Sequence, residues 1–177
     1  ADTKGSWETV PLPANEKDWL HATHTALLPN GKVLIANGSA NRNTLTFEDG
    51  KAVFLDGVNS SDYDTVNNTL LFDPSSQKYE RIASPTSVQA GDSNDLFCGA
   101  QVQMLDGNLL FISGTSRYYP GENFEGSKQS NLYDWKTGNW STVGQMKEGR
   151  WYPSLVPLKD GKIAIFSGLK FGKPGQI

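Results

Sequence analysis

The chain has little cysteine, little histidine and no concentrated positive charge. Its 177 residues include one cysteine, two histidines, and 16 Lys and Arg residues against 19 Asp and Glu residues. One cysteine excludes an internal disulfide and a CxxC metal or redox motif. Nucleic acid and anionic membrane surfaces both need a concentrated positive patch, so neither is expected as the main partner. No apolar run reaches the roughly 20 residues that a membrane-spanning helix needs.

Two further absences concern targeting and helices. The amino terminus has no charged-then-apolar leader, so a secretory signal has been removed or was never present, and Ala1 fits a mature end. No segment of ten or more residues keeps a helical period, which indicates an all-β chain. A secreted, extracellular glycoprotein is favoured by four Asn-x-Ser/Thr sequons, at Asn37, Asn59, Asn67 and Asn139.

Three segments repeat one pattern. They are LLPNGKVLIANG (27–38), MLDGNLLFISG (104–114) and LKDGKIAIFSG (158–168). Each has an Asn-Gly or Asp-Gly pair, then an apolar run, then a closing glycine. Such pairs supply the positive φ angles of a tight hairpin turn, and the apolar run fits a strand covered on both faces. The turn glycines are Gly31, Gly107 and Gly161, and the closing glycines are Gly38, Gly114 and Gly168.

A second pattern follows the first two hairpins. LLFDPSSQKY (70–79) matches LYDWKTGNW (132–140): a strand, an aspartate, a polar turn, and an aromatic residue. The full unit is thus four strands. Its period is 76 residues between Gly31 and Gly107, and 54 between Gly107 and Gly161, against roughly 50 for a kelch blade. The longer first unit has an insertion at residues 39–69, where we expect an extra hairpin that turns at Asp49 and Gly50.

These patterns predict an all-β fold, a kelch-type β-propeller of seven blades, of which this chain supplies about the first two to three. Blade 1 covers about 20–80, blade 2 about 95–142, and the start of blade 3 about 150–177, with Trp7 to Val10 as an isolated outer strand. A ring needs roughly four to eight blades to close. The remainder of the propeller is therefore expected on a separate polypeptide or fragment. A small independent sandwich with coincidental spacing is the alternative.

Cys98 and Tyr152 occupy matching places in successive repeats. Cys98 lies eight residues before Asp106, and Tyr152 lies eight residues before Asp160. The register places both on the innermost strands of neighbouring blades, at the end that lines the central axis. Since adjacent innermost strands lie side by side in a propeller, we expect the sulfur and the phenol to touch.

At these two motifs the sequence resembles the copper radical oxidases, which include galactose oxidase and glyoxal oxidase, and the second motif is closer to the glyoxal oxidase branch. The motifs are DLFCG (95–99) and RWYPS (150–154). The resemblance extends from about Trp7 to Gly168. It implies a thioether bond between Cys98 and Tyr152, with Tyr152 binding a copper ion and holding a radical.

The resemblance also implies an activity: oxidation of a primary alcohol or small aldehyde by O2, giving H2O2. A sulfur ortho to the phenol oxygen delocalises the radical, while the protein positions the metal and tunes its ligands. The family's second tyrosine and two histidines come from later blades and a terminal domain, and no residue of this chain matches them. The alternatives are a buried free thiol at Cys98 and a non-catalytic kelch propeller that binds a glycan or protein.

Other residues near the motifs are weaker candidates. Phe97 and Trp151 are expected to pack around the site, and Arg150 to hold a blade interface through backbone carbonyls. Residues 115–128 form a candidate substrate loop. Its Arg117, Tyr118 and Tyr119 could meet a polar substrate. Lys170 stands where galactose oxidase has a stacking tryptophan, and Phe171 follows it. Residues i and i+3 of a strand do not share a face, so His21 and His24 are unlikely to bind one metal together.

Overall fold

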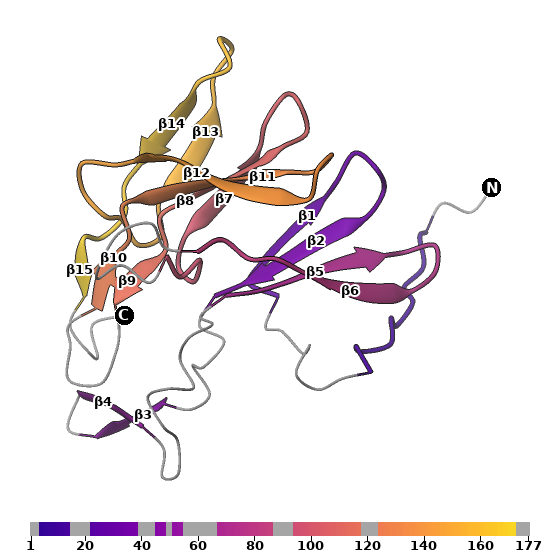
Figure 1. Cartoon of the computed structure of the whole chain (residues 1–177), viewed down its shortest axis with the longest axis horizontal. Coiled ribbons are helices and arrows are strands. Elements are labelled where there is room, and N and C mark those ends of the chain that lie inside the picture. The colour runs from indigo at the N-terminus through magenta and orange to yellow at the C-terminus, as the bar shows by residue number, and fades with distance from the viewer. Residues whose placement is uncertain are drawn as a thin grey trace.

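The computed structural model describes residues 4–14, 22–38, 45–48, 51–54, 67–86, 94–117 and 124–172. These residues form strands, turns and irregular segments without a helix, so the described ranges hold no helix that could cross a membrane. The expectation of an all-β chain is confirmed. Figure 1 shows the strands gathered in several antiparallel sheets, none of which closes on itself.

The first repeat forms a four-stranded antiparallel sheet in the order β1-β2-β5-β6. Its strands are β1 (His24–Leu27), β2 (Val33–Asn37), β5 (Asn68–Asp73) and β6 (Lys78–Ile82). The second repeat forms the same arrangement, in the order β7-β8-β11-β12. Its strands are β7 (Ala100–Gln103), β8 (Leu109–Ile112), β11 (Gln129–Asp134) and β12 (Asn139–Gln145).

The third repeat supplies the hairpin of β13 (Ser154–Pro157) and β14 (Ile163–Phe166). In Figure 1 this hairpin lies beyond the second sheet, on the side away from the first. The insertion hairpin predicted around residues 49 and 50 is also present. It pairs β3 (Leu45–Glu48) with β4 (Lys51–Phe54), with Glu48 and Lys51 as register partners, and Asp49 and Gly50 lie outside the described residues.

The turns form as their residue types predict. Gly31, Gly107 and Gly161 have φ angles of 81°, 85° and 81°, a conformation that glycine adopts without steric cost. The aspartate that ends β5 accepts hydrogen bonds from the Ser75 main chain and hydroxyl, at 2.9 and 2.6 Å. These bonds lower the pKa of Asp73 to about 2. Each hairpin is therefore specified by local sequence.

The hydrophobic core lies between the first two sheets. Its fully buried members come from both repeats and are Leu28, Leu34, Ala36, Leu96, Leu109, Phe111 and Tyr133. Trp140 packs on the rings of Phe111 and Tyr133, and its indole N–H donates to the Ala83 carbonyl across the sheet boundary at 2.8 Å. Burying a side chain such as Phe111 contributes roughly 1.5–3 kcal/mol. The core thus fixes the two sheets against each other.

The edge strands that begin the repeats lie side by side. The Gln101 and Gln103 side-chain amides on β7 donate to the Thr25 and Leu27 carbonyls of β1, at 2.6 and 3.1 Å. On its other side β7 contacts β13. This row of first strands brings the segments that precede them together.

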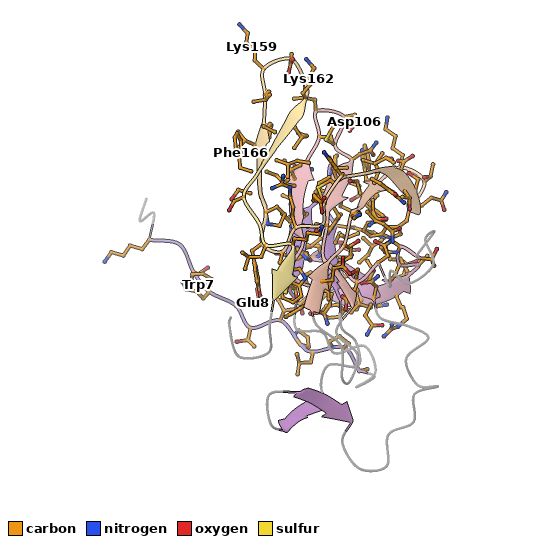
Figure 2. The ribbon with its side chains drawn as sticks, turned by 90° about the vertical axis from the view of Figure 1, so that its left-hand side faces the viewer. Trp7, Glu8, Asp106, Lys159, Lys162 and Phe166 are labelled. Carbon is orange, nitrogen blue, oxygen red and sulfur yellow. The ribbon has the colours of Figure 1, made fainter. Side chains whose placement is uncertain are left out.

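The amino-terminal segment departs from the prediction. Trp7 to Val10 was expected to form an outer strand, but residues 4–10 have no strand pairing, and Trp7 is fully exposed. Figure 2 shows Trp7 at one side of the molecule on the amino-terminal arm, and the next residue, Glu8, accepts a hydrogen bond from the Gln77 side chain between β5 and β6 at 3.2 Å. A tryptophan with no apolar neighbour to cover it gives the segment no packing energy that would hold it in a strand.

Candidate functional site

Cys98 and Tyr152 occupy the same position in successive repeats. Each lies two residues before the first strand of its hairpin, since β7 begins at Ala100 and β13 begins at Ser154. Each has a left-handed backbone, with φ of 67° and 53°. The prediction that they lie within the innermost strands is wrong in this detail: both precede their strand, because a positive φ ends the extended conformation.

The two side chains meet. The Cys98 thiol donates to the Tyr152 hydroxyl, with Sγ 3.2 Å from Oη. The main chains are also joined, because the Tyr152 N–H donates to the Cys98 carbonyl at 2.8 Å. Cys98 is 6% exposed, whereas Tyr152 is 53% exposed. The sulfur is therefore held inside the protein, and the phenol can reach an external ligand.

The backbone at this pair is strained on both sides. Cys98 is the third residue of a turn that the Gly99 N–H closes onto the Leu96 carbonyl at 3.0 Å. Glycine is the usual residue at a turn position with positive φ, and a non-glycine residue there costs of order 1–3 kcal/mol. Surrounding contacts must overcome that cost twice, once for each member of the pair.

Two aromatic residues cover the sulfur. Trp151 is 2% exposed and forms a small apolar cluster with Cys98, against which Phe97 packs. The main chain of Trp151 exchanges two hydrogen bonds with Leu169, at 2.7 and 2.9 Å. This pairing anchors the residue that directly precedes Tyr152.

Charged side chains near the pair are engaged with protein groups. The Arg150 guanidinium donates to the Ser167 carbonyl at 2.5 Å. This is a backbone carbonyl, as predicted, but it lies within the third repeat and not across a boundary between repeats. Lys170 forms an ion pair with Glu148 at 2.5 Å, and hydrogen bonding from Lys170 lowers the pKa of Glu148.

His24 has a structural environment. It is buried, its Nε2 lies 2.9 Å from the Leu96 carbonyl, and its ring meets the Phe111 ring edge-on. Burial lowers the pKa of His24, and the hydrogen bond to Leu96 only partly opposes this. The Nε2 atom carries the proton that this bond needs. His24 is thus occupied in joining the first repeat to the segment before Cys98, and His21 lies outside the described residues.

The candidate substrate loop is partly strand. Its two ends form β9 (Thr115–Arg117) and β10 (Phe124–Gly126), and β10 also pairs with β15 (Phe171–Gly172). Arg117 lies in β9 and Phe171 lies in β15, whereas Tyr118 and Tyr119 lie outside the described residues. Within the predicted substrate loop, residues 115–117 and 124–126 are therefore strands, because β9 and β10 pair with each other and β10 pairs with β15 of the third repeat.

Two buried residues that the sequence did not single out contact both motifs. Ser113 and Thr115 are each 1% exposed and flank the closing glycine of the second repeat. Thr115 binds the segment that holds Cys98, and Ser113 binds the segment that holds Tyr152. A signal was available in the sequence, since Ser113 and Ser167 both precede a closing glycine.

Tyr152 is the candidate metal ligand among the described residues, and those residues hold no complete metal site. Within those ranges no three His, Cys, Asp or Glu side chains gather as metal ligands would. The exposed phenol of Tyr152 is a suitable oxygen donor, and the adjacent sulfur is suited to modify it. The Tyr152 phenol oxygen would fit copper as one ligand of a larger set.

The sequons differ in accessibility. Asn37 and Asn67 are each 3% exposed, and the Asn67 amide donates to the Asn94 carbonyl at 2.7 Å while accepting from the Leu96 N–H at 2.9 Å. Asn139 is exposed on β12. Asn59 lies outside the described residues. Of the described sequons, Asn139 alone presents its amide to solvent.

Comparison with known proteins gives a likeness of fold. No family model matches the chain. No curated protein matches it either. The structure is similar to that of a novel fungal alcohol oxidase with catalytic diversity among the AA5 family, in complex with copper, with a TM-score of 0.57 and 18% sequence identity. The similarity covers 84% of this chain and 26% of that one, so the chain spans about a quarter of the neighbour's length.

Proposed function

We propose that this chain carries the cysteine and tyrosine of a copper radical oxidase, with Cys98 joined to Tyr152 by a thioether bond. The observation that carries the proposal is the contact of 3.2 Å between Cys98 Sγ and Tyr152 Oη. A sulfur bonded to the ring carbon beside the phenol carbon lies at a similar distance from the phenol oxygen. The contact therefore brings together the two side chains that the cross-link would join.

The reaction proposed is oxidation of a primary alcohol or small aldehyde by O2. For an alcohol, RCH2OH and O2 give RCHO and H2O2. Copper would supply one-electron redox chemistry when bound, and the cross-linked ring would accept the second of the two electrons that leave the substrate. Tyr152 would hold the metal through its phenol oxygen, and the sulfur of Cys98 would delocalise the unpaired electron of the ring. Phe97 and Trp151 keep water from that sulfur.

The fold proposed for the whole protein is a secreted kelch-type propeller of seven blades, of which this chain is a part. In the first two sheets the second strand pairs with a third, as β2 with β5 and β8 with β11. Among the described residues, β14 pairs only with β13. Phe166 on β14 is 55% exposed, whereas Ala36 and Ile112, at the same place in the repeat, are 0% and 3% exposed. Figure 2 shows Phe166 on the outer side of this hairpin.

The partner proposed is therefore the rest of the propeller. An apolar strand with an open edge is a site for pairing with a further strand. Two strands like β11 and β12 would cover Phe166 and extend the third sheet to four strands. We expect the remaining copper ligands, a second tyrosine and two histidines, in this additional polypeptide.

The cross-link is the decisive test. When the complete protein, with the additional polypeptide present, is incubated with copper and O2, this chain should become lighter by the two hydrogen atoms that leave with the new bond. Peptides bearing Cys98 and Tyr152 should migrate together under reducing conditions. Cys98→Ser and Tyr152→Phe should each retain the full mass. A Cys98 that stays unmodified and alkylatable after this treatment would exclude the oxidase and leave a propeller that only binds a glycan or protein.

A further inference from the structure

The segment Ser113–Gly114–Thr115 lies where the two motifs approach each other. It follows β8, and its members are almost completely buried. Gly114 has a φ of 127°, and a Cβ at this position would overlap the Asp95 carbonyl. Only a residue without a side chain lets this segment pass so close to the DLFCG motif. The hydroxyl-bearing residues Ser113 and Thr115 flank this glycine, so the close approach brings both of them near the motif.

Thr115 holds the segment that carries Cys98. Its N–H donates to the Asp95 carbonyl at 2.8 Å, and the Asp95 N–H donates to the Thr115 carbonyl at 3.3 Å. Its hydroxyl donates to the Phe97 carbonyl at 2.9 Å. Phe97 directly precedes Cys98. The turn that gives Cys98 its left-handed backbone is thus attached to Thr115 at Phe97 within the turn and at Asp95 directly before it.

Ser113 holds the segment that carries Tyr152. The Arg150 N–H donates to the Ser113 hydroxyl at 3.1 Å. The same hydroxyl contacts the Arg150 carbonyl, and it lies 2.6 Å from the Ser127 carbonyl. A hydroxyl has one hydrogen, so it donates to one of these carbonyls at a time while accepting from Arg150. Arg150 lies two residues before Tyr152, and its main chain is fixed from the second repeat.

Main-chain positioning matters here because the Tyr152 ring is 53% exposed. A half-exposed ring is held only weakly by packing, so its position depends on the backbone that carries it. Thioether formation breaks the S–H bond of Cys98 and one ring C–H bond of Tyr152, and it forms one S–C bond. Two protons and two electrons leave and reduce O2 to H2O2. The sulfur must meet one ring carbon, so a shift of either segment slows the step.

We infer that Ser113 and Thr115 are positioning residues that hold the Cys98 and Tyr152 segments in register for thioether formation. The inference rests on the proposed function, but the alignment itself can be measured without copper. The Tyr152 N–H donates to the Cys98 carbonyl at 2.8 Å. The hydrogen-exchange protection of this one amide therefore reports whether the two segments stay aligned.

The variants are Ser113→Ala and Thr115→Val, each of which removes one hydroxyl. Thr115→Ser restores the hydroxyl. Ser167→Ala is the matched control, because Ser167 has the same place in the third repeat and a similar φ of 59°, but it is exposed and not part of this segment. All are made in the natural full-length protein, produced without copper so that no thioether has formed.

Protection of the Tyr152 amide should fall about 2- to 10-fold in each hydroxyl-deleting variant, as loss of one net hydrogen bond predicts. The core amide of Leu34 should keep its protection, and Thr115→Ser and Ser167→Ala should match the parent. With copper and O2 added, the mass loss should be slower in Ser113→Ala and Thr115→Val by a similar factor, and Thr115→Ser should recover the parent rate.

Amide protection tests the positioning role of Ser113 and Thr115, and the mass loss tests the proposed thioether bond. Unchanged Tyr152 protection in both hydroxyl-deleting variants overturns the positioning role, whether or not the thioether forms. A parent protein that never loses the two hydrogens overturns the proposed function, and a selective fall in Tyr152 protection would then still support the alignment by Ser113 and Thr115. If Ser113→Ala fails to fold, the comparison of Thr115→Val with Thr115→Ser decides whether the hydroxyl positions the Cys98 segment.

Discussion

Replacing Gly114 by alanine is expected to separate the Cys98 segment from the rest of the second repeat. Gly114 has a φ of 127°, in a region that L residues rarely adopt, and the added methyl would overlap the Asp95 carbonyl oxygen. Relief of the overlap requires the Asp95 main chain to move. The two main-chain hydrogen bonds between Asp95 and Thr115 are directly beside this contact and would be lost first.

The expected loss of unfolding free energy in Gly114→Ala has two contributions, the backbone strain and the lost hydrogen bonds. A non-glycine residue in such a conformation costs about 1–3 kcal/mol, and two hydrogen bonds at about 0.5–1.5 kcal/mol each add about 1–3 kcal/mol. The free energy of unfolding should fall by about 2–6 kcal/mol. Gly144→Ala is the control, because a Cβ at Gly144 meets nothing within 4 Å and its φ is not positive. That change should be neutral or stabilise by about 0.4–1 kcal/mol.

Urea unfolding of the copper-free protein, followed by tryptophan fluorescence, measures both free energies. A second assay follows the reaction of Cys98 with a thiol reagent under native conditions. Cys98 is 6% exposed, so the reaction should be slow in the parent and in Gly144→Ala and faster in Gly114→Ala. Equal stability and equal thiol reactivity in the two variants would refute the close-approach argument for Gly114.

Two further predictions concern pH and modification. Burial lowers the pKa of His24 from 6.5 in the folded state, so the unfolded state binds a proton first as pH falls and stability is lost below about pH 6.5. His24→Gln keeps a hydrogen-bond donor for the Leu96 carbonyl but does not titrate. The free energy of unfolding should therefore fall less between pH 7 and lower pH in this variant than in the parent. An equal fall in both proteins would show that other groups cause the loss of stability. If the protein is secreted, Asn139 should carry a glycan and Asn67 should not, because the Asn67 amide is committed to main-chain hydrogen bonds. Enzymatic glycan removal with peptide mapping checks this, and a glycan on Asn67 in the folded protein would contradict it.

The hairpins could be predicted because their information is local. An Asn-Gly or Asp-Gly pair sets a turn, and the apolar run beside it sets a strand, as seen at Gly31, Gly107 and Gly161. The contact between Cys98 and Tyr152 could also be expected, since equal repeats place equal positions beside one another. That expectation needed only the spacing of 54 residues.

Features that depend on distant partners could not be predicted. β10 pairs with the nearby β9 on one side and with β15, more than 40 residues later, on the other, and the pairing with β15 has no local sequence pattern that predicts it. Trp7 has a strand-like sequence around it, but no neighbouring surface covers it. The roles of Ser113 and Thr115 were equally hidden, because serine and threonine beside a glycine are ordinary turn residues until their partners are known.

The candidate site depends on a shared backbone position and on two particular side chains. Ala22, Cys98 and Tyr152 stand two residues before the first strand of their repeats and have φ angles of 47°, 67° and 53°. The left-handed backbone at this position is thus common to all three repeats. The chemistry of the site depends instead on the side chains there, a thiol in the second repeat and a phenol in the third. The Ser113 hydroxyl of the second repeat contacts the main chain of Arg150, which belongs to the third repeat. Ser167, at the equivalent place in that repeat, is exposed, so the burial of Ser113 comes from the segment of the following repeat that packs against it.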